Sequence, residues 1–189
     1  MMKTLINIEN KFKEITLLSQ ATDLSIYPIT EHTGFEIRMN EKKEHGEVFT
    51  PIELVDKMIE ISKPEPDKLN MDLCAGHGQF TIRILRKFVN ENKNFNIYSY
   101  LQKYHWFNEY NIDSSLKLLY IFGENINLCV GPAQELKSMP TDINGFWLKG
   151  VFYWDQLLNR WSSKDIEELE ALYNIQQPNK KESSSKALF

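Results

Sequence analysis

Two glycines, Gly76 and Gly78, follow a short apolar run that contains Asp72, and a new apolar-periodic segment begins at Phe80. A strand, a glycine turn and a helix in this order bring backbone N–H groups and a helix N-terminus against a ligand. Glycine suits such a turn because a Cβ atom would block the approach of the ligand to the backbone. We therefore predict that Asp72, Ala75, Gly76, Gly78 and Phe80 bind a nucleotide-like cofactor, although a G-x-G turn also serves tight packing alone.

A second candidate segment, Phe49-Thr50-Pro51, lies upstream at the start of an amphipathic helix. Thr50 is a good N-cap, Pro51 suits the first helical position, and Glu53 completes a capping box. Pro64 ends the helix. The positions that recur at helical spacing are Ile52, Val55, Met58, Ile59 and Ser62. This helix is expected to hold Phe49, Thr50 and Pro51 near the glycine turn.

Strands and helices alternate along the rest of the chain. Apolar runs predict strands over 69–74, 104–110 and 126–130, and a further strand that continues to at least Tyr153. Helical spacing predicts helices over 3–19, 80–90 and 113–120, and a final helix capped by Ser162 or Ser163. Strands that alternate with helices indicate an α/β protein with a mostly parallel sheet and helices on both faces.

The two motifs together resemble a known family. GEVFTP, an amphipathic helix and DLCAGHGQF are similar to the N6-adenine DNA methyltransferases whose cofactor motifs precede their catalytic motif. That family carries G-x-x-x-T-P and then D-x-x-x-G-x-G-x-F, which are matched here by Gly46, Phe49, Thr50, Pro51, Asp72, Gly76, Gly78 and Phe80. The resemblance implies a Rossmann-like class I methyltransferase fold, S-adenosylmethionine as cofactor and DNA as a partner.

Glu109 stands at the end of the second expected strand. An acid at that place can accept hydrogen bonds from both ribose hydroxyls of a nucleoside, and in the family it does so for S-adenosylmethionine. The spacing from Gly78 exceeds the roughly 20 residues typical of nucleotide-binding units. Residues 92–103 resemble an insertion that accounts for the excess. A surface glutamate at a strand end fits the sequence equally well.

The sequence departs from the family in two places. Pro132 stands where the family has an aspartate that recognises adenine, and proline offers neither a carboxylate nor an N–H. The catalytic signature, in which Asp, Asn or Ser precedes Pro-Pro and an aromatic residue, is missing because the chain contains no Pro-Pro. In the family its polar side chain holds the target amine and its ring stacks on the flipped base. Asp155 is a candidate for the missing polar residue.

The segment Phe146–Trp161 is rich in aromatic residues. In a strand, Phe152 and Trp154 share one face, whereas Val151 and Tyr153 share the other. We expect the segment to expose an aromatic surface for self-association, a protein partner or single-stranded nucleic acid. A core strand with an interface patch is the competing interpretation.

Composition limits the class of protein. The formal net charge of -4 argues against a surface that grips nucleic acid all round. Cys74 and Cys129 lie in strand-like runs without metal-ligand spacing, and we expect both thiols to be buried. The N-terminal stretch is interrupted by charges and matches neither a signal peptide nor a membrane span, so a cytoplasmic location is expected.

The predicted organisation is a helical extension over 1–45, a methyltransferase-like α/β domain over 46–175 and a polar, disordered tail over 176–189. Three functions remain open. The chain is an active methyltransferase with a divergent catalytic segment, a non-catalytic relative that binds a protein or nucleic acid, or a different enzyme that uses S-adenosylmethionine or another nucleoside. We predict an S-adenosylmethionine-binding protein whose catalytic motif is divergent or lost.

Overall fold

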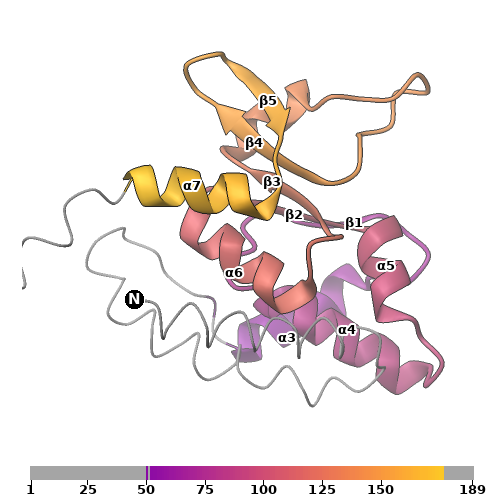
Figure 1. Cartoon of the computed structure of the whole chain (residues 1–189). Coiled ribbons are helices and arrows are strands. Elements are labelled where there is room, and N and C mark those ends of the chain that lie inside the picture. The colour runs from indigo at the N-terminus through magenta and orange to yellow at the C-terminus, as the bar shows by residue number, and fades with distance from the viewer. Residues whose placement is uncertain (1–49, 51, 177–189) are drawn as a thin grey trace, which may run out of the picture.

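A computed structural model describes residue 50 and residues 52–176 (Figure 1). Its elements are α3 (Ile52–Ser62), β1 (Asn70–Asp72), α4 (Gln79–Glu91), α5 (Ile97–Lys103), β2 (His105–Glu109), α6 (Ile112–Phe122), β3 (Asn127–Val130), η2 (Ala133–Ser138), β4 (Val151–Asp155), β5 (Arg160–Ser163) and α7 (Ile166–Gln176). The expected extension over 1–45, its helix over 3–19, and the tail beyond residue 176 lie outside the described residues.

The strands form one mixed sheet in the order β1-β2-β3-β4-β5. The pairs β1–β2, β2–β3 and β3–β4 are parallel, and β4 pairs with β5 in antiparallel fashion. The predicted α/β class is therefore confirmed. The strand order advances in one direction, whereas a doubly wound sheet reverses its order at the ligand site. The Rossmann-like order consequently remains a prediction.

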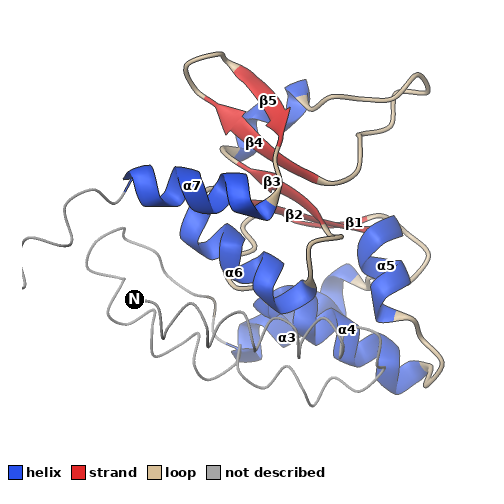
Figure 2. Cartoon of the chain, viewed as in Figure 1, coloured by secondary structure: helices blue, strands red, loops and turns tan. Residues whose placement is uncertain are grey.

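The two faces of the sheet are covered differently. Phe107, Leu128 and Val151 face a core that also contains buried residues of α4, α5, α6 and α7, and Figure 2 shows these helices on one side of the sheet. The opposite face is covered by η2 and the segment that follows it, through Leu136 and Met139. The expectation of helices on both faces is thus not met by the described α-helices. Crossovers of one hand stay on one face when the strand order advances in one direction, which fits the β1–β2 and β2–β3 connections, whereas the β3–β4 connection through η2 crosses the opposite face.

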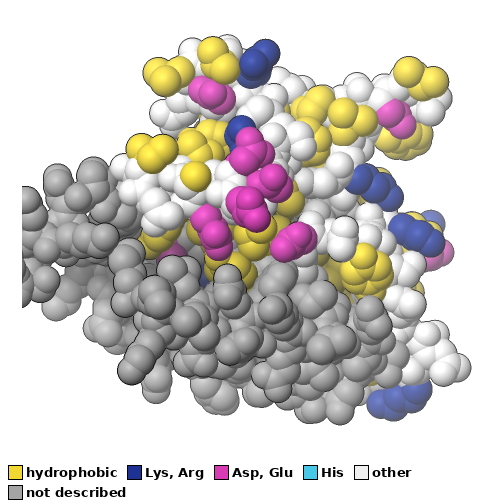
Figure 3. All heavy atoms as spheres, viewed as in Figure 1, with side chains coloured by type: hydrophobic (Ala, Val, Ile, Leu, Met, Phe, Trp, Pro, Cys, Tyr) yellow, Lys and Arg dark blue, Asp and Glu magenta, His cyan; other side chains and the backbone are white. Residues whose placement is uncertain are grey.

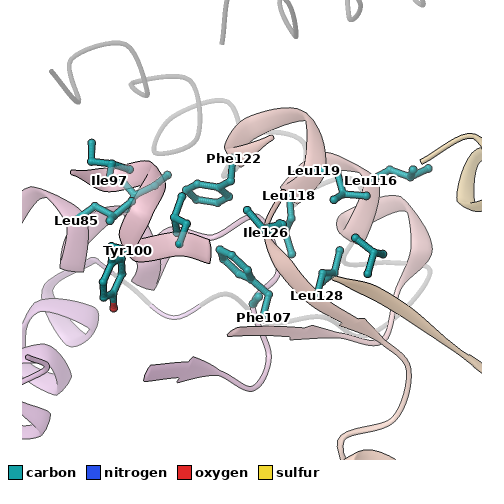
Figure 4. Close-up of a cluster of buried hydrophobic side chains, with 14 of the residues drawn as sticks. Leu85, Ile97, Tyr100, Phe107, Leu116, Leu118, Leu119, Phe122, Ile126 and Leu128 are labelled. Atoms are coloured by element: carbon teal, nitrogen blue, oxygen red, sulfur yellow. The ribbon is translucent and has the colours of Figure 1, made fainter. Parts of the chain in front are cut away.

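The helices that support the site follow the predicted periodicity. α4 buries Thr81, Ile82, Leu85, Phe88 and Val89, which confirms the helix expected over 80–90. α6 starts where Oδ1 of Asn111 accepts a hydrogen bond from the Asp113 N–H at 2.8 Å, so its cap lies earlier than residue 113. In Figure 4, Phe107 of β2 lies beside Phe122 of α6, and their ring centroids are 5.1 Å apart. This contact joins the sheet to the helical layer.

Three of the six aromatic residues in the segment Phe146–Trp161 are core, whereas Phe146 is 66% exposed. Phe152, Trp154 and Trp161 are 6%, 7% and 8% exposed and pack under η2, so the predicted interaction surface is wrong for these residues. The indole Nε1 of Trp161 donates to the Glu135 carbonyl at 2.8 Å, which accounts for the polar atom of this buried ring. The predicted alternation is confirmed, because Phe152 and Trp154 share one face and Val151 and Tyr153 the other.

Candidate cofactor-binding site

A cavity of about 640 Å³ lies beside β1, between α3 and the first turn of α4. Its volume is in the range of small-molecule and cofactor sites, roughly 300–1,000 Å³. The predicted residues in its wall are Thr50, Asp72, Ala75, Gly76, Phe80 and Glu109. Gly78 is not in the wall, and Phe49 and Pro51 lie outside the described residues. Residues far apart in the sequence therefore meet at one cavity, as the motifs require, and their role as cofactor ligands remains a prediction.

Glu109 ties the turn after β1 to the end of β2. Its Oε2 accepts a hydrogen bond from the Gly76 N–H at 2.7 Å, and its Oε1 accepts one from the Asn111 N–H at 2.8 Å. The residue is only 9% exposed, so it is not a surface glutamate. Each carboxylate oxygen has more than one lone-pair site, so both can still accept a hydrogen bond from a ligand hydroxyl.

Gly76 and Gly78 have different roles in the turn. Both have positive φ values, 53° and 81°, which favour glycine over residues with a Cβ. Gly76 lies in the cavity wall, whereas a Cβ on Gly78 would lie 2.4 Å from Cε2 of Phe122 and 3.2 Å from Cδ2 of Leu118. Gly78 therefore lets α4 approach α6, and the part of the turn that faces the cavity is the part around Gly76.

Asp72 has an unusual carboxyl group for a residue at a cavity wall. Burial raises its pKa from the ordinary 3.8 to about 6, and the negative charge of Glu109 adds to this effect. The Cys74 N–H and the Thr81 hydroxyl, whose Oγ1 lies 3.4 Å from Oδ2, donate to the carboxyl and oppose the shift. Asp72 therefore changes charge near neutral pH, and a cation in the cavity would favour its ionised form.

Sequence reasoning missed the polar residues behind Asp72. His105 lines the cavity yet is 1% exposed, and its Nε2 lies 2.8 Å from Oγ1 of Thr81. Its Nδ1 lies 3.3 Å from the hydroxyl of Tyr100. Burial lowers the pKa of His105 to about 3, so its ring is neutral at physiological pH. The available signal was a histidine two positions before Phe107, which places it on the same face of β2 as this core residue.

Residues 35–112 match the N-6 DNA Methylase family model. This range covers less than half of the chain and includes both motifs, α3, β1, α4 and β2. The predicted family resemblance is thereby confirmed over that range, and the chain is methyltransferase-like there. No curated protein and no solved structure matches the chain.

The residues at the two departures from the family do not line the cavity. Oδ1 of Asp155 accepts hydrogen bonds from the N–H groups of Leu157 and Leu158 at 2.9 and 3.0 Å, so it stabilises the turn between β4 and β5. β4 is three strand intervals from β1, about 14 Å at the usual strand spacing. Pro132 precedes η2 beyond the end of β3. These hydrogen bonds give Asp155 a structural role. Its position away from the cavity does not support the predicted catalytic role.

The described residues contain neither a metal-binding cluster nor a helix that could span a membrane. Among residues 50 and 52–176, no group of three or more His, Cys, Asp or Glu side chains could hold a metal ion. In the same part of the chain, no helix is long and apolar enough to cross a membrane. Cys129 is buried as expected, whereas Cys74 is exposed and lines the cavity, because the chain leaves β1 at Asp72 and turns toward the site.

Proposed function

We propose that the cavity beside β1 binds S-adenosylmethionine and that the chain is a methyltransferase-like protein that does not methylate DNA on its own. The observation that carries the proposal is Glu109, a carboxylate that bridges the Gly76 N–H and the Asn111 N–H in the wall of the cavity. Its carboxylate lies next to the glycine turn, within the range that matches the methylase family, and this position supports a role as acceptor for ribose hydroxyls.

The charges in the wall suit this ligand. S-adenosylmethionine carries a sulfonium and an ammonium group, and Asp72 and Glu109 supply carboxyl groups to the same cavity. We place the methionine end near Thr50, Asp72 and Gly76, and the ribose at Glu109. The cofactor would supply the methyl group, while these residues bind and orient it.

The binding test is calorimetric titration with S-adenosylmethionine, S-adenosylhomocysteine and adenosine. Met58 lies in the wall on α3 and is 46% exposed, so Met58→Trp adds bulk to the cavity mouth with room to fold. We expect about tenfold or weaker binding, a loss of at least ~1.4 kcal/mol. The matched control is Ile61→Trp, one turn along the same helix, where the side chain is 81% exposed and lies outside the wall.

Two results would contradict this placement. The first is a folded wild-type chain that binds none of these ligands at millimolar concentration. The second is Met58→Trp binding S-adenosylmethionine as tightly as Ile61→Trp does. Binding of adenosine with an affinity equal to that of S-adenosylmethionine would instead favour a pocket for another nucleoside.

DNA adenine is the target class implied by the family, and the surface restricts where DNA could approach. Figure 3 shows acidic side chains gathered over the start of α7, where Glu167 and Glu168 form the first turn. This face would repel a phosphate backbone. Any DNA contact is therefore proposed at the face that contains the cavity.

A further inference from the structure

Four polar side chains form a continuous row that leads from the cavity wall into the core. Oδ2 of Asp72 lies 3.4 Å from Oγ1 of Thr81, which lies 2.8 Å from Nε2 of His105, and Nδ1 of His105 lies 3.3 Å from the Tyr100 hydroxyl. Thr81, His105 and Tyr100 are 0%, 1% and 2% exposed. We call these four residues the buried relay. The proposed cofactor site uses only its first member.

The number of hydrogens in the relay limits how it can be bonded. Thr81 has one hydroxyl hydrogen, so it donates either to Asp72 or to His105. A neutral imidazole has one N–H, so one ring nitrogen of His105 donates while the other accepts. The Tyr100 hydroxyl lies within reach of Nδ1 of His105, and the Asn70 side chain forms a hydrogen bond with it that lowers the pKa of Tyr100. These constraints leave two arrangements of the bonds that run from Asp72 through Thr81 to His105.

The first arrangement belongs to ionised Asp72. The Thr81 hydroxyl donates to the carboxylate, Nε2–H of His105 donates to Thr81, and the Tyr100 hydroxyl donates to Nδ1. In the second, a protonated Asp72 donates to Thr81, Thr81 donates to Nε2, and Nδ1–H donates to the Tyr100 oxygen. One proton is exchanged between Asp72 and solvent, and His105 keeps a single ring proton in both arrangements.

We propose that Thr81 and His105 are positioning residues that couple the charge of Asp72 to the tautomer of His105. A cation bound in the cavity would then change which ring nitrogen of the buried His105 carries the proton. The connection to a ligand rests on the function proposed above, whereas the relay is tested on the ligand-free chain.

The surroundings of Asp72 are compatible with this coupling. The groups that face its carboxyl are Glu109 from β2, the Cys74 N–H from its own turn, and Thr81 from α4. From α3, only Met58, Ile59 and Ser62 reach the cavity wall, and none of them is charged. The pKa of Asp72 near 6 and that of His105 near 3 mean that Asp72 titrates while His105 stays neutral. A change at His105 near pH 6 must then be tautomeric.

The experiment follows the imidazole nitrogens of His105 by NMR in the full chain, from pH 5 to pH 8 without ligand. We expect the Nδ1–H form at pH 5 to give way to the Nε2–H form at pH 8, with a midpoint at about 6. Thr81→Val is nearly isosteric and should abolish the transition, whereas Thr81→Ser keeps the hydroxyl and should retain it. A single tautomer across this range, while the Asp72 carboxyl signal titrates, would overturn the relay.

A second arm adds saturating S-adenosylmethionine. A cation beside Asp72 should move the His105 midpoint to lower pH, by one unit or more for a roughly tenfold preference for the ionised form. Measurable binding without any movement of the His105 midpoint would overturn the ligand coupling. Absence of binding would refute the proposed function, and the ligand-free titration would still decide the relay.

Discussion

Single residues at this site have structural roles beside the binding roles proposed for them. Glu109 is the clearest case, because its carboxylate holds the turn at Gly76 and the start of α6 at Asn111. A buried acid that accepts two backbone N–H groups is oriented before any ligand arrives. Asp72, in the same cavity, is less well stabilised in its charged form, because burial outweighs its hydrogen bonds. Glu109 therefore holds the backbone of the turn, whereas Asp72 is the acid whose charge changes near neutral pH.

The raised pKa of Asp72 has a consequence for folding. Its pKa of about 6 in the folded chain lies above the ordinary 3.8, so the stability it contributes is complete below about pH 3.8 and is lost as pH rises through 6. Asp72→Asn removes this loss, which we expect to amount to about 3 kcal/mol in full and to about 1.4 kcal/mol between pH 5 and pH 7.5. Urea denaturation at pH 5 and pH 7.5 should show the variant gaining relative to wild type at the higher pH.

The matched control for this measurement is Asp67→Asn, which changes an exposed carboxylate in the loop before β1. Its difference from wild type should not vary between the two pH values. If Asp72→Asn and Asp67→Asn show the same pH dependence, the explanation based on burial of Asp72 is wrong.

At the scale of elements, the site depends on how closely α4 approaches α6. The missing Cβ of Gly78 makes room for Phe122 and Leu118, and Phe122 in turn contacts Phe107 of β2. The glycine turn is therefore fixed by core packing on one side and faces the cavity on the other. A substitution at Gly78 that disturbs its packing against Phe122 would therefore loosen the cavity wall, although Gly78 itself does not line the cavity.

Gly78→Ala tests this packing role. The new Cβ would lie 2.4 Å from the Phe122 ring at a φ of 81°, so overpacking and backbone strain should together cost about 2–4 kcal/mol of unfolding free energy. Gly145→Ala is the control, because Gly145 has a φ of 80° with no atom within 4 Å of the added Cβ, and only the strain of about 1–2 kcal/mol should remain. Equal losses in the two variants would refute the packing role.

At the scale of the whole molecule, the strand order does not show which part of the chain would take the place of the family's catalytic segment. β1 leads into the glycine turn at the outer edge of the sheet, and no strand among the described residues pairs with its other side. Ligand sites of doubly wound sheets lie where the strand order reverses, with strands on both sides. Here β3, β4 and β5 extend the sheet away from the cavity.

We therefore expect the purified chain to transfer no methyl groups to adenine in DNA. Labelled S-adenosylmethionine and unmethylated DNA provide the assay, with cofactor binding measured on the same sample so that inactivity is not misread as misfolding. Turnover that disappears in Asp155→Asn and survives in Asp142→Asn would contradict us. Asp142 is a fair control because its Oδ1 also accepts turn N–H groups, those of Asn144 and Phe146.

Local patterns in the sequence were sufficient to predict the elements and the position of the cofactor motifs. Helical spacing located α4 and α6, apolar runs located β1, β2 and β3, and six of the predicted site residues, the first Thr50 and the last Glu109, lie in the wall of one cavity. These predictions succeed because periodicity and glycine turns act over a few residues. α5 was missed, since its seven residues were interpreted as part of an insertion, and η2 and β5 were missed as well. The cap expected at Ser162 or Ser163 is wrong, because both residues lie in β5 and α7 begins at Ile166.

Only the tertiary structure decided which side chains share an environment. The strand order, the burial of Trp154 and Trp161, the contact of Gly78 with Phe122, and the bonding of His105 to Thr81 all join segments distant in sequence. A strand pattern gives two faces but not the layer that covers each one. The pKa of Asp72 is likewise decided by the tertiary structure, because it depends on burial and on the charge of Glu109, which no local sequence pattern encodes.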